Sequence, residues 1–396
     1  MKTSKTTYLH TTHHQSNWLR IFVLGLFMLT MPTENYGQII PLEKDQWNTF
    51  NNDNNEQVQT RITEFKGKKA LHLKRHEFAV PNIDFNTYTN FTLEFDVAAV
   101  AMPGIGFHSQ DLWNFEFVFL RLNNSGQKTA VQYVPVYNGA SSWQLYNYPV
   151  YEGIAEFDMS DWIHVKLKVF GDNMQIFVDH ESTPNLAVKL AHDNSEAKYI
   201  FLKTSFDEAY FANITIEELE TPFEVEQKLP EETYLTNWKI FEQFESELKT
   251  QFEVYRILEQ KRNVRSITAD EYGLVNLARY YDHPRNWAMA KTTFVSEKEQ
   301  TKELLFDYSS IATIVLNGQI IFFGRELDTH NYGLVEDGEQ TLSLHLKSGE
   351  NTLVFLVKAD DLWQEGMGNP PYLGRTQAMN WGFIARLADY ANINLE

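Results

Sequence analysis

The sequence contains no cysteine among its 396 residues. This absence excludes disulfide bonds, a thiolate nucleophile, thiolate zinc ligands and a lipid anchor attached through cysteine. Long apolar runs are also scarce: residues 21 to 31 form a short one, below the roughly 20 residues that a membrane-spanning helix needs. Basic residues are outnumbered, and a formal net charge of −19 makes nucleic acid and anionic membrane surfaces poor partners.

Short motifs of catalysis and metal binding are missing as well. The histidines are scattered without an H-E-x-x-H or H-x-H pair, and there is no D-x-D-x-D-G run for calcium. The chain also lacks the G-x-S-x-G elbow, the phosphate-binding G-x-x-x-x-G-K-[ST] loop and a dinucleotide-binding G-x-G-x-x-G after a strand. We therefore predict no metal, no cofactor and no complete catalytic set.

The first 37 residues have the composition of a secretory signal. Lys2, Lys5 and Arg20 make a basic start, the apolar run 21–31 follows, and small Gly37 lies near the end of a polar stretch. We expect this segment to be cleaved, with no membrane insertion of the mature chain. A bacterial protein that is secreted or periplasmic fits this segment and the lack of cysteine.

What is abundant is aromatic and apolar residues, at 14% and 43% of the chain. The roughly 360 residues that follow the signal suffice for two domains of ordinary size. PFEVEQKLP, residues 222 to 230, is charged and bounded by prolines, as linkers often are. We predict a first domain at 40–219, a linker at 220–236 and a second domain at 237–390.

The first domain has the alternation of β-strands. In FTLEFDVA, one face receives Phe91, Leu93, Phe95 and Val97, while Thr92, Glu94 and Asp96 lie on the other. The segment 162–178 predicts a hairpin, because Gly171, Asp172 and Asn173 supply a turn at its centre. Many short strands without a long helical period predict an all-β fold with two β-sandwich, or jelly-roll, domains in tandem.

Five segments of the first domain carry a resemblance to a known superfamily. They are NFTLEFDV, GIGFHSQDLWNFEFVFLR, VQYVPVYNGASSWQLY, WIHVKLKVFGDNMQIFVD and YFANITI. Together they resemble the concanavalin A-like lectin/glucanase (LamG-like) jelly rolls of exported bacterial proteins. The glucanases of that superfamily carry an E-x-D-x-x-E catalytic pattern. Here Glu94 and Asp96 match its first two positions but position 99 is alanine, so we interpret both carboxylates as solvent-facing strand residues.

The same resemblance implies a sugar-binding role for the concave sheet or the edge loops, where rings stack on sugars and amides or carboxylates bind hydroxyl groups. Strand parity places Glu116 and Arg121 on opposite faces unless a bulge intervenes. Each ring taken alone is more often a core residue than a ligand platform. The candidate ligand-binding residues are Trp113, Glu116, Arg121, Gln132, Tyr133, Asn138, Trp143 and Gln144, with Tyr146 beside them.

The second domain begins with a helical period. Apolar residues recur at three- and four-residue spacing from Trp238 to Arg262, which predicts a helix, with two strands joined by a loop as the alternative. Asn317-Gly318 is a strong hairpin turn signal. Residues 349–351, GEN, predict a second hairpin turn, between a strand that ends near Leu346 and the strand 353–357.

The segments ATIVLNGQIIFFG, LKSGENTLVFLVKA and WGFIARLAD resemble the galactose-binding-domain-like sandwich that accompanies many glycoside hydrolases. The resemblance covers residues 238 to 389 and says little about a ligand. The long connection 363–379 could place Trp363, Tyr372 and Arg375 at a rim site, although an insertion packed against the neighbouring domain is the simpler interpretation.

Two functions from different classes follow. The first is a non-catalytic, exported protein that binds a poly- or oligosaccharide on the concave face of the first sandwich. The second is a glycoside hydrolase or lyase that uses Glu116 with Asp111 or Arg121, which requires an open cleft with a second carboxylate. A structural or interaction module without a sugar ligand is the third alternative.

Overall fold

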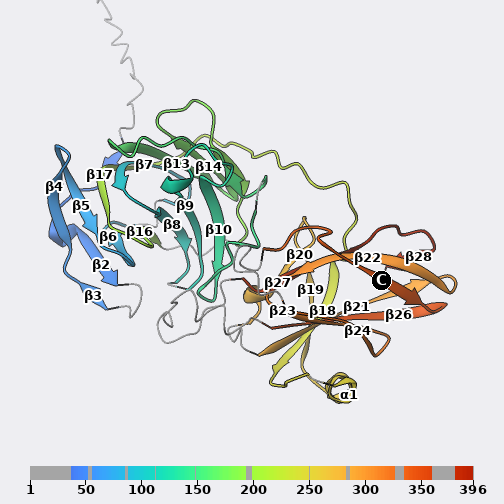
Figure 1. Cartoon of the computed structure of the whole chain (residues 1–396). Helices are drawn as coiled ribbons and strands as arrows, with labels where there is room; N and C mark the ends of the chain where they lie inside the picture. The colour runs from blue at the N-terminus through green and yellow to red at the C-terminus, as the bar shows by residue number, and fades with distance from the viewer. Residues whose placement is uncertain are drawn as a thin grey trace, which may run out of the picture. The chain divides into compact units, whose positions relative to one another are not determined.

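The computed structural model describes residues 37 to 395, with the exception of 52–55, 85–87, 112, 148, 193–198, 249, 282–285, 326–333 and 359–379. The predicted signal segment before Gly37 and the connection with Trp363, Tyr372 and Arg375 lie outside the described residues. Residues 37 to 396 belong to one compact unit. The fold is all-β, as predicted, and its antiparallel strands form four sheets that we name A to D (Figure 1).

Sheets A and B are built from residues 38 to 218. Sheet A has, in order, β15 (Leu186–Lys189), β14 (Asn173–Val178), β13 (Ile163–Phe170), β7 (Phe91–Ala99), β17 (Ala209–Glu218), β5 (Lys68–Leu73) and β4 (Arg61–Phe65), with β1 (Gln38–Ile39) beside β17. Sheet B has β11 (Ala140–Ser141), β10 (Val131–Tyr137), β9 (Phe115–Leu120), β8 (Pro103–Ser109), β16 (Tyr199–Thr204), β6 (Glu77–Pro81), β2 (Trp47–Asn51) and β3 (Gln57–Val58), with β12 (Glu152–Gly153) beside β10.

Sheets C and D are built from residues 237 to 395. Sheet C has β19 (Val264–Thr268), β18 (Asn237–Phe244), β21 (Trp287–Ser296), β26 (Gly349–Lys358), β23 (Ile311–Leu316) and β24 (Gln319–Arg325), with β28 (Ile393–Leu395) beside β21. Sheet D has β20 (Leu274–Asn276), β27 (Gly382–Leu387), β22 (Gln300–Tyr308) and β25 (Gln340–Leu346). Short 3-10 turns occur at Lys44–Gln46, Leu122–Asn124 and Leu277–Arg279.

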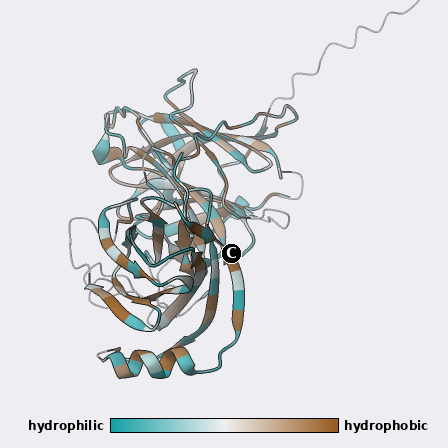
Figure 2. Ribbon diagram, turned by 90° about the vertical axis from the view of Figure 1, so that its right-hand side faces the viewer, coloured by the Kyte–Doolittle hydropathy of each residue, from teal (hydrophilic) through white to brown (hydrophobic). Residues whose placement is uncertain are grey.

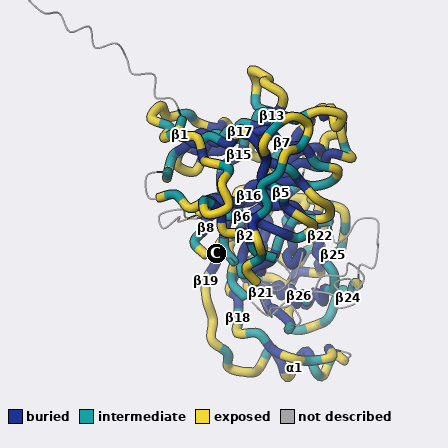
Figure 3. The backbone as a smooth tube through the Cα atoms, turned by 90° about the vertical axis from the view of Figure 1, so that its left-hand side faces the viewer, coloured by how far each residue is buried: buried dark blue, intermediate teal, exposed yellow. Residues whose placement is uncertain are grey.

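Each pair of sheets encloses one apolar core, as alternation requires. The predicted face of β7, with Phe91, Leu93, Phe95 and Val97, lies in the first core. The second core is centred on Trp238, whose ring packs edge-on against Phe383 and Phe355. Buried residues accordingly follow the strands, while exposed residues gather in the connections (Figure 3).

The helix predicted from Trp238 to Arg262 is confined to α1 (Gln251–Glu259), and the first part of that segment is strand β18. Trp238 and Ile240 both point into the core, as alternate residues of a strand do. The helix begins only after Thr250, which forms a capping box with Glu253. Hydrophobic and hydrophilic residues are interspersed along α1 (Figure 2). Its buried Val254 and Ile257 join an apolar cluster with residues of sheet C, so the helix covers that sheet.

The predicted hairpin turns have different outcomes. Gly171-Asp172 closes β13 and β14, and Asn317-Gly318 closes β23 and β24 with positive φ at both residues, as predicted. The turn before Asn351 does not close a hairpin, because β25 pairs in sheet D and β26 in sheet C. The chain crosses between the sheets just before Gly349, and residues 349–351 already belong to β26, so both the predicted turn and the predicted pairing were wrong.

Asn351 holds that crossing together and is fully buried. Its side chain accepts hydrogen bonds from Lys347 N (3.1 Å) and Asn317 Nδ2 (2.9 Å), and donates to the carbonyl oxygens of Lys347 (2.8 Å) and Gly349 (3.0 Å).

We expect Asn351→Ala to lower the free energy of unfolding by about 3 kcal/mol, because buried polar groups lose their partners. Urea unfolding of the variant and the wild type measures this difference in the free energy of unfolding. Asn263→Ala, which removes an exposed amide, should change it by less than about 0.5 kcal/mol, and equal stability of both variants would contradict the assignment.

Candidate functional site

The outer face of sheet B carries a continuous set of aromatic side chains, most of which are buried. Strand pairing aligns one row across the sheet: Gln132, Phe119, Gly104, Lys203, Phe78 and Phe50. The neighbouring row holds Phe117 and Phe201, and Phe115 follows on the same face. We call the surface made by these six phenylalanines, Phe50, Phe78, Phe115, Phe117, Phe119 and Phe201, the ring face.

Two glycines of β8 make room for these rings. A Cβ atom at Gly104 would lie 2.7 Å from the ring of Phe117, and one at Gly106 would lie 2.0 Å from the ring of Phe201. The outer ends of both rings therefore approach backbone that bears no side chain. The rings form a separate apolar cluster, which also includes Tyr146, Tyr234, Leu274 and Ile384.

Two cationic side chains contact the rings of the ring face. Lys203 Nζ lies 5.5 Å from the ring centre of Phe117, and the Arg121 guanidinium lies 5.3 Å from that of Phe119. Arg121 also lies 5.6 Å from the ring centre of Trp143, in the loop after β11. These are cation–π distances, so the charges are held against the aromatic surface.

Arg121, Gln132, Trp143 and Glu152 form a fixed polar corner at the edge of the ring face, which we call the Trp143 corner. Arg121 Nη1 pairs with Glu152 Oε1 at 2.8 Å, and Arg121 Nη2 donates to Gln132 Oε1. Gln132 Nε2 donates to the carbonyl oxygens of Trp143 (2.6 Å) and Tyr146 (2.7 Å). The loop that carries Trp143 is thus tied to the sheet, and the Trp143 side chain remains half-buried.

The predicted ligand-binding residues fall into two groups by burial. Glu116, Gln132 and Tyr133 are fully enclosed, and protein groups occupy their polar atoms. Trp113, Arg121, Asn138, Trp143 and Gln144 are half-buried. Sequence parity correctly placed Glu116 and Arg121, which directly follows β9, on opposite sides of sheet B. It could not foresee that residues 142 to 146 would fold over Gln132.

Glu116 points into the core between sheets A and B. Its carboxylate accepts hydrogen bonds from Tyr133 Oη (2.6 Å) and His192 N (3.0 Å), and His192 Nδ1 lies 3.2 Å away. Burial by itself would raise the pKa of Glu116, but His192 and Tyr133 outweigh it and hold this pKa below its usual value. The glutamate is therefore an ionised, enclosed core residue that no substrate can reach in this conformation.

The remaining predicted residues serve in turns and connections. Asp111 Oδ1 accepts the backbone N–H groups of Trp113 (2.7 Å) and Asn114 (2.8 Å), which forms the turn before β9. Asn138 Nδ2 donates to the Ala278 carbonyl oxygen at 2.8 Å, and Gln144 N donates to Asn380 Oδ1 at 2.8 Å. Asn138 and Gln144 thus tie the first pair of sheets to residues of the second pair.

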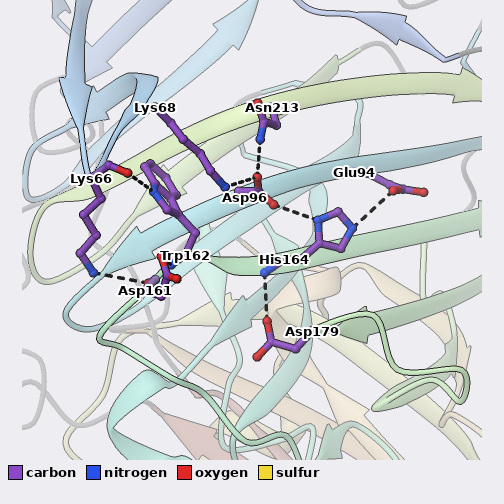
Figure 4. Close-up of polar contacts among 9 residues, drawn as sticks. All are labelled: Lys66, Lys68, Glu94, Asp96, Asp161, Trp162, His164, Asp179 and Asn213. Atoms are coloured by element: carbon purple, nitrogen blue, oxygen red, sulfur yellow. Dashed lines mark hydrogen bonds and ion pairs between the residues drawn. The ribbon is translucent and has the colours of Figure 1, made fainter.

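A second polar cluster, which sequence reasoning missed, lies on the outer face of sheet A (Figure 4). Glu94 and Asp96 lie there as parity predicted, but they are only partly exposed, at 30% and 11% of their side chains. His164, directly opposite Asp96 on β13, contacts both. The signal in the sequence is weak, because His164 is a single polar residue in an alternating strand and its partner lies 68 residues away.

No group of three or more histidine, aspartate or glutamate side chains is placed to hold a metal ion within the part of the chain that the structure describes. The same described residues include no helix long and apolar enough to cross a bilayer.

The chain matches no family model and no curated protein. Solved structures with carbohydrate-binding and galectin-like folds resemble part of it. Carbohydrate-binding module CBM66 from Bacillus subtilis is 19% identical, with a TM-score of 0.32 over 44% of this chain and 96% of the module. The exoplasmic/lumenal domain of VIP36, bound to Ca²⁺ and Man3GlcNAc, is 10% identical, with a TM-score of 0.31 over 47% and 91%. A Bacillus subtilis protein of unknown function with a galectin-like fold is 10% identical, with a TM-score of 0.30 over 46% and 94%. At these scores the likenesses carry no conclusion about a ligand of this chain.

Proposed function

We propose that this chain is an exported, non-catalytic carbohydrate-binding protein that holds a glycan at the Trp143 corner of the ring face. We take the first sandwich to be a LamG-like domain with the ring face as its concave side. The second sandwich, which resembles galactose-binding domains, extends and stiffens the platform. The site of action is outside the cytoplasm, in the periplasm or the medium.

One observation carries the proposal: a half-buried indole is held rigidly beside a guanidinium, an amide and a carboxylate. Trp143 is fixed through its carbonyl oxygen by Gln132, and its ring rests against Arg121, which pairs with Glu152. Saccharides are bound by such sets, in which a ring covers the apolar face of the sugar and nearby polar groups bind its hydroxyls. A fixed ring also loses little conformational entropy on binding.

The enclosure of Glu116 supports the non-catalytic form of the proposal. A glycoside hydrolase needs two carboxyl groups on either side of the scissile bond, about 5 to 9.5 Å apart. Glu116 is fully buried among protein donors, while Asp111 is occupied in a turn. Glu94 and Asp96 bind His164 and lack the third acid of the glucanase pattern, because position 99 is alanine.

A glycan array probed with residues 38–396 tests this function, and Trp143→Ala is the decisive variant. We expect at least a tenfold loss of affinity, about 1.4 kcal/mol, because the stacking surface is removed. Trp162→Ala is the matched control, since it removes a half-buried tryptophan of the first sandwich that lies beside sheet A. That control should bind like the wild type.

Isothermal titration against the best ligand of the array gives the affinities. Flat signal across all polysaccharides would remove the sugar-binding function and leave a structural or interaction module. Undiminished binding by Trp143→Ala would remove the assigned site.

A further inference from the structure

His164 lies between two carboxylates on the outer face of sheet A (Figure 4). Its Nδ1 is 2.9 Å from Asp96 Oδ1, and its Nε2 is 3.3 Å from Glu94 Oε2. Carboxylates only accept hydrogen bonds, and a neutral imidazole has a single N–H to donate. Both contacts can therefore be hydrogen bonds only when the ring is doubly protonated.

The surrounding groups keep both carboxylates ionised. Lys68 Nζ from β5 (2.8 Å) and Asn213 Nδ2 from β17 (2.5 Å) reach Asp96 Oδ2, and Lys166 Nζ from β13 reaches Glu94 Oε1 (2.6 Å). Burial opposes ionisation of Asp96, but His164, Lys68 and Asn213 outweigh it and its pKa is lowered. The pKa of His164 is raised, chiefly by its hydrogen bond to Asp96.

A strained turn rests on the same histidine. Asp179 and His180, which follow β14, have φ values of 48° and 60°, a region that costs energy for residues other than glycine. The His180 ring stacks on the His164 ring, with centres 4.0 Å apart. The two backbones are also joined, because His164 N donates to Asp179 Oδ1 (3.1 Å) and Asp179 N donates to the His164 carbonyl oxygen (2.9 Å).

We propose that His164 is a pH-sensitive clasp. While it is doubly protonated, it holds the Asp179–His180 turn next to the two carboxylates of β7. Loss of one proton leaves a ring that can donate to only one carboxylate, so the ring reorients toward one partner. The strained turn then opens more often.

The sign of the pH effect follows from the raised pKa of His164. The stability that His164 contributes to the fold is fully present below the pKa of histidine in the unfolded chain, near 6.5. This contribution is lost as the pH rises through the higher pKa of His164 in the folded protein. The carboxylates act in the opposite range, because the lowered pKa of Asp96 makes its contribution disappear only in acid. A loss of order as the pH rises therefore has the sign of the histidine and the opposite sign to that of the carboxylates.

Hydrogen–deuterium exchange of the segment 176–186 between pH 5.5 and 9, corrected for the intrinsic rate, tests the clasp. In the wild type we expect protection to fall toward high pH, because the stabilisation by the doubly protonated ring is lost there. His164→Gln should be weakly protected at every pH, with no transition. His72→Gln is the matched control, because His72 also pairs with a glutamate on sheet A but lies at Tyr210, away from the turn.

A second variant keeps the test decisive if His164→Gln does not fold. Glu94→Ala removes one of the two acceptors, so a neutral ring suffices and the transition should shrink or move to lower pH. A wild-type profile that is flat, or one that persists unchanged in either variant, would overturn the proposal. If His72→Gln also removed the transition, the transition would not belong to His164, and the proposal would be overturned equally.

Discussion

Replacing Gly106 with alanine is expected to lower the free energy of unfolding by about 3 kcal/mol, the upper end of the usual cost of overpacking. The added methyl group would lie 2.0 Å from Cζ of the Phe201 ring, which real contacts do not permit. That ring cannot step aside, because Phe115 and Phe78 hold it at ring-centre distances of 5.0 and 5.5 Å. Urea unfolding followed by tryptophan fluorescence measures the change.

A double-mutant cycle gives the control. Phe201→Ala alone should cost about 3 to 5 kcal/mol, because it leaves a cavity in the ring face. With that ring gone, Gly106→Ala should cost much less than in the wild type, since the clash has been removed. Additive effects of the two substitutions would show that the ring does not lie over Gly106.

Glu116→Gln is expected to cost about 3 kcal/mol of stability at neutral pH without altering glycan affinity. The amide keeps the shape of the side chain but loses the charge, and its single oxygen cannot accept from both Tyr133 Oη and His192 N, which now bind separate carboxylate oxygens. Because the pKa of Glu116 is lowered in the folded protein, its contribution is present above the unfolded-state value and is lost as the pH falls through the folded-state value. The variant should therefore lose less stability on acidification than the wild type.

Urea midpoints between pH 3 and 7 measure this difference, with titration of a glycan ligand at pH 7 as the functional readout. Tyr133→Phe removes one donor to the same carboxylate and should cost less, about 1 to 2 kcal/mol. If Glu116→Gln instead kept full stability and lost a hydrolytic activity, Glu116 would act on a substrate and the enclosed role assigned to it would be wrong.

Local features were predictable because each depends on a few neighbouring residues. The two faces of β7, the separation of Glu116 from Arg121, and the Asn317-Gly318 turn follow from the two-residue period and from the φ angles that Asn and Gly tolerate. The helix was predictable in part, since the capping box at Thr250 marks its start. The apolar spacing before Thr250 suits either a helix or a strand with a bulge.

Features that join distant segments could not be predicted. The turn before Asn351 looks like a hairpin turn, yet the strands on either side pair in different sheets. Gln132 and Trp143 belong together because a loop returns over β10, and no local pattern records that return. His164 became a partner of Asp96 only when β13 paired with β7.

The sequence alone determined that this chain folds into stacked antiparallel sheets, because alternation along a strand decides which side chains enter a core. Tertiary structure alone decided which of those side chains are enclosed and which remain partly exposed. It enclosed Glu116, Gln132 and Tyr133, left Trp143 half-buried beside Arg121, and placed His164 between two carboxylates. The physical reason is that the alternation of side chains is a property of a single strand. The burial of a side chain and its hydrogen-bond partners depend on residues that are far apart in the chain.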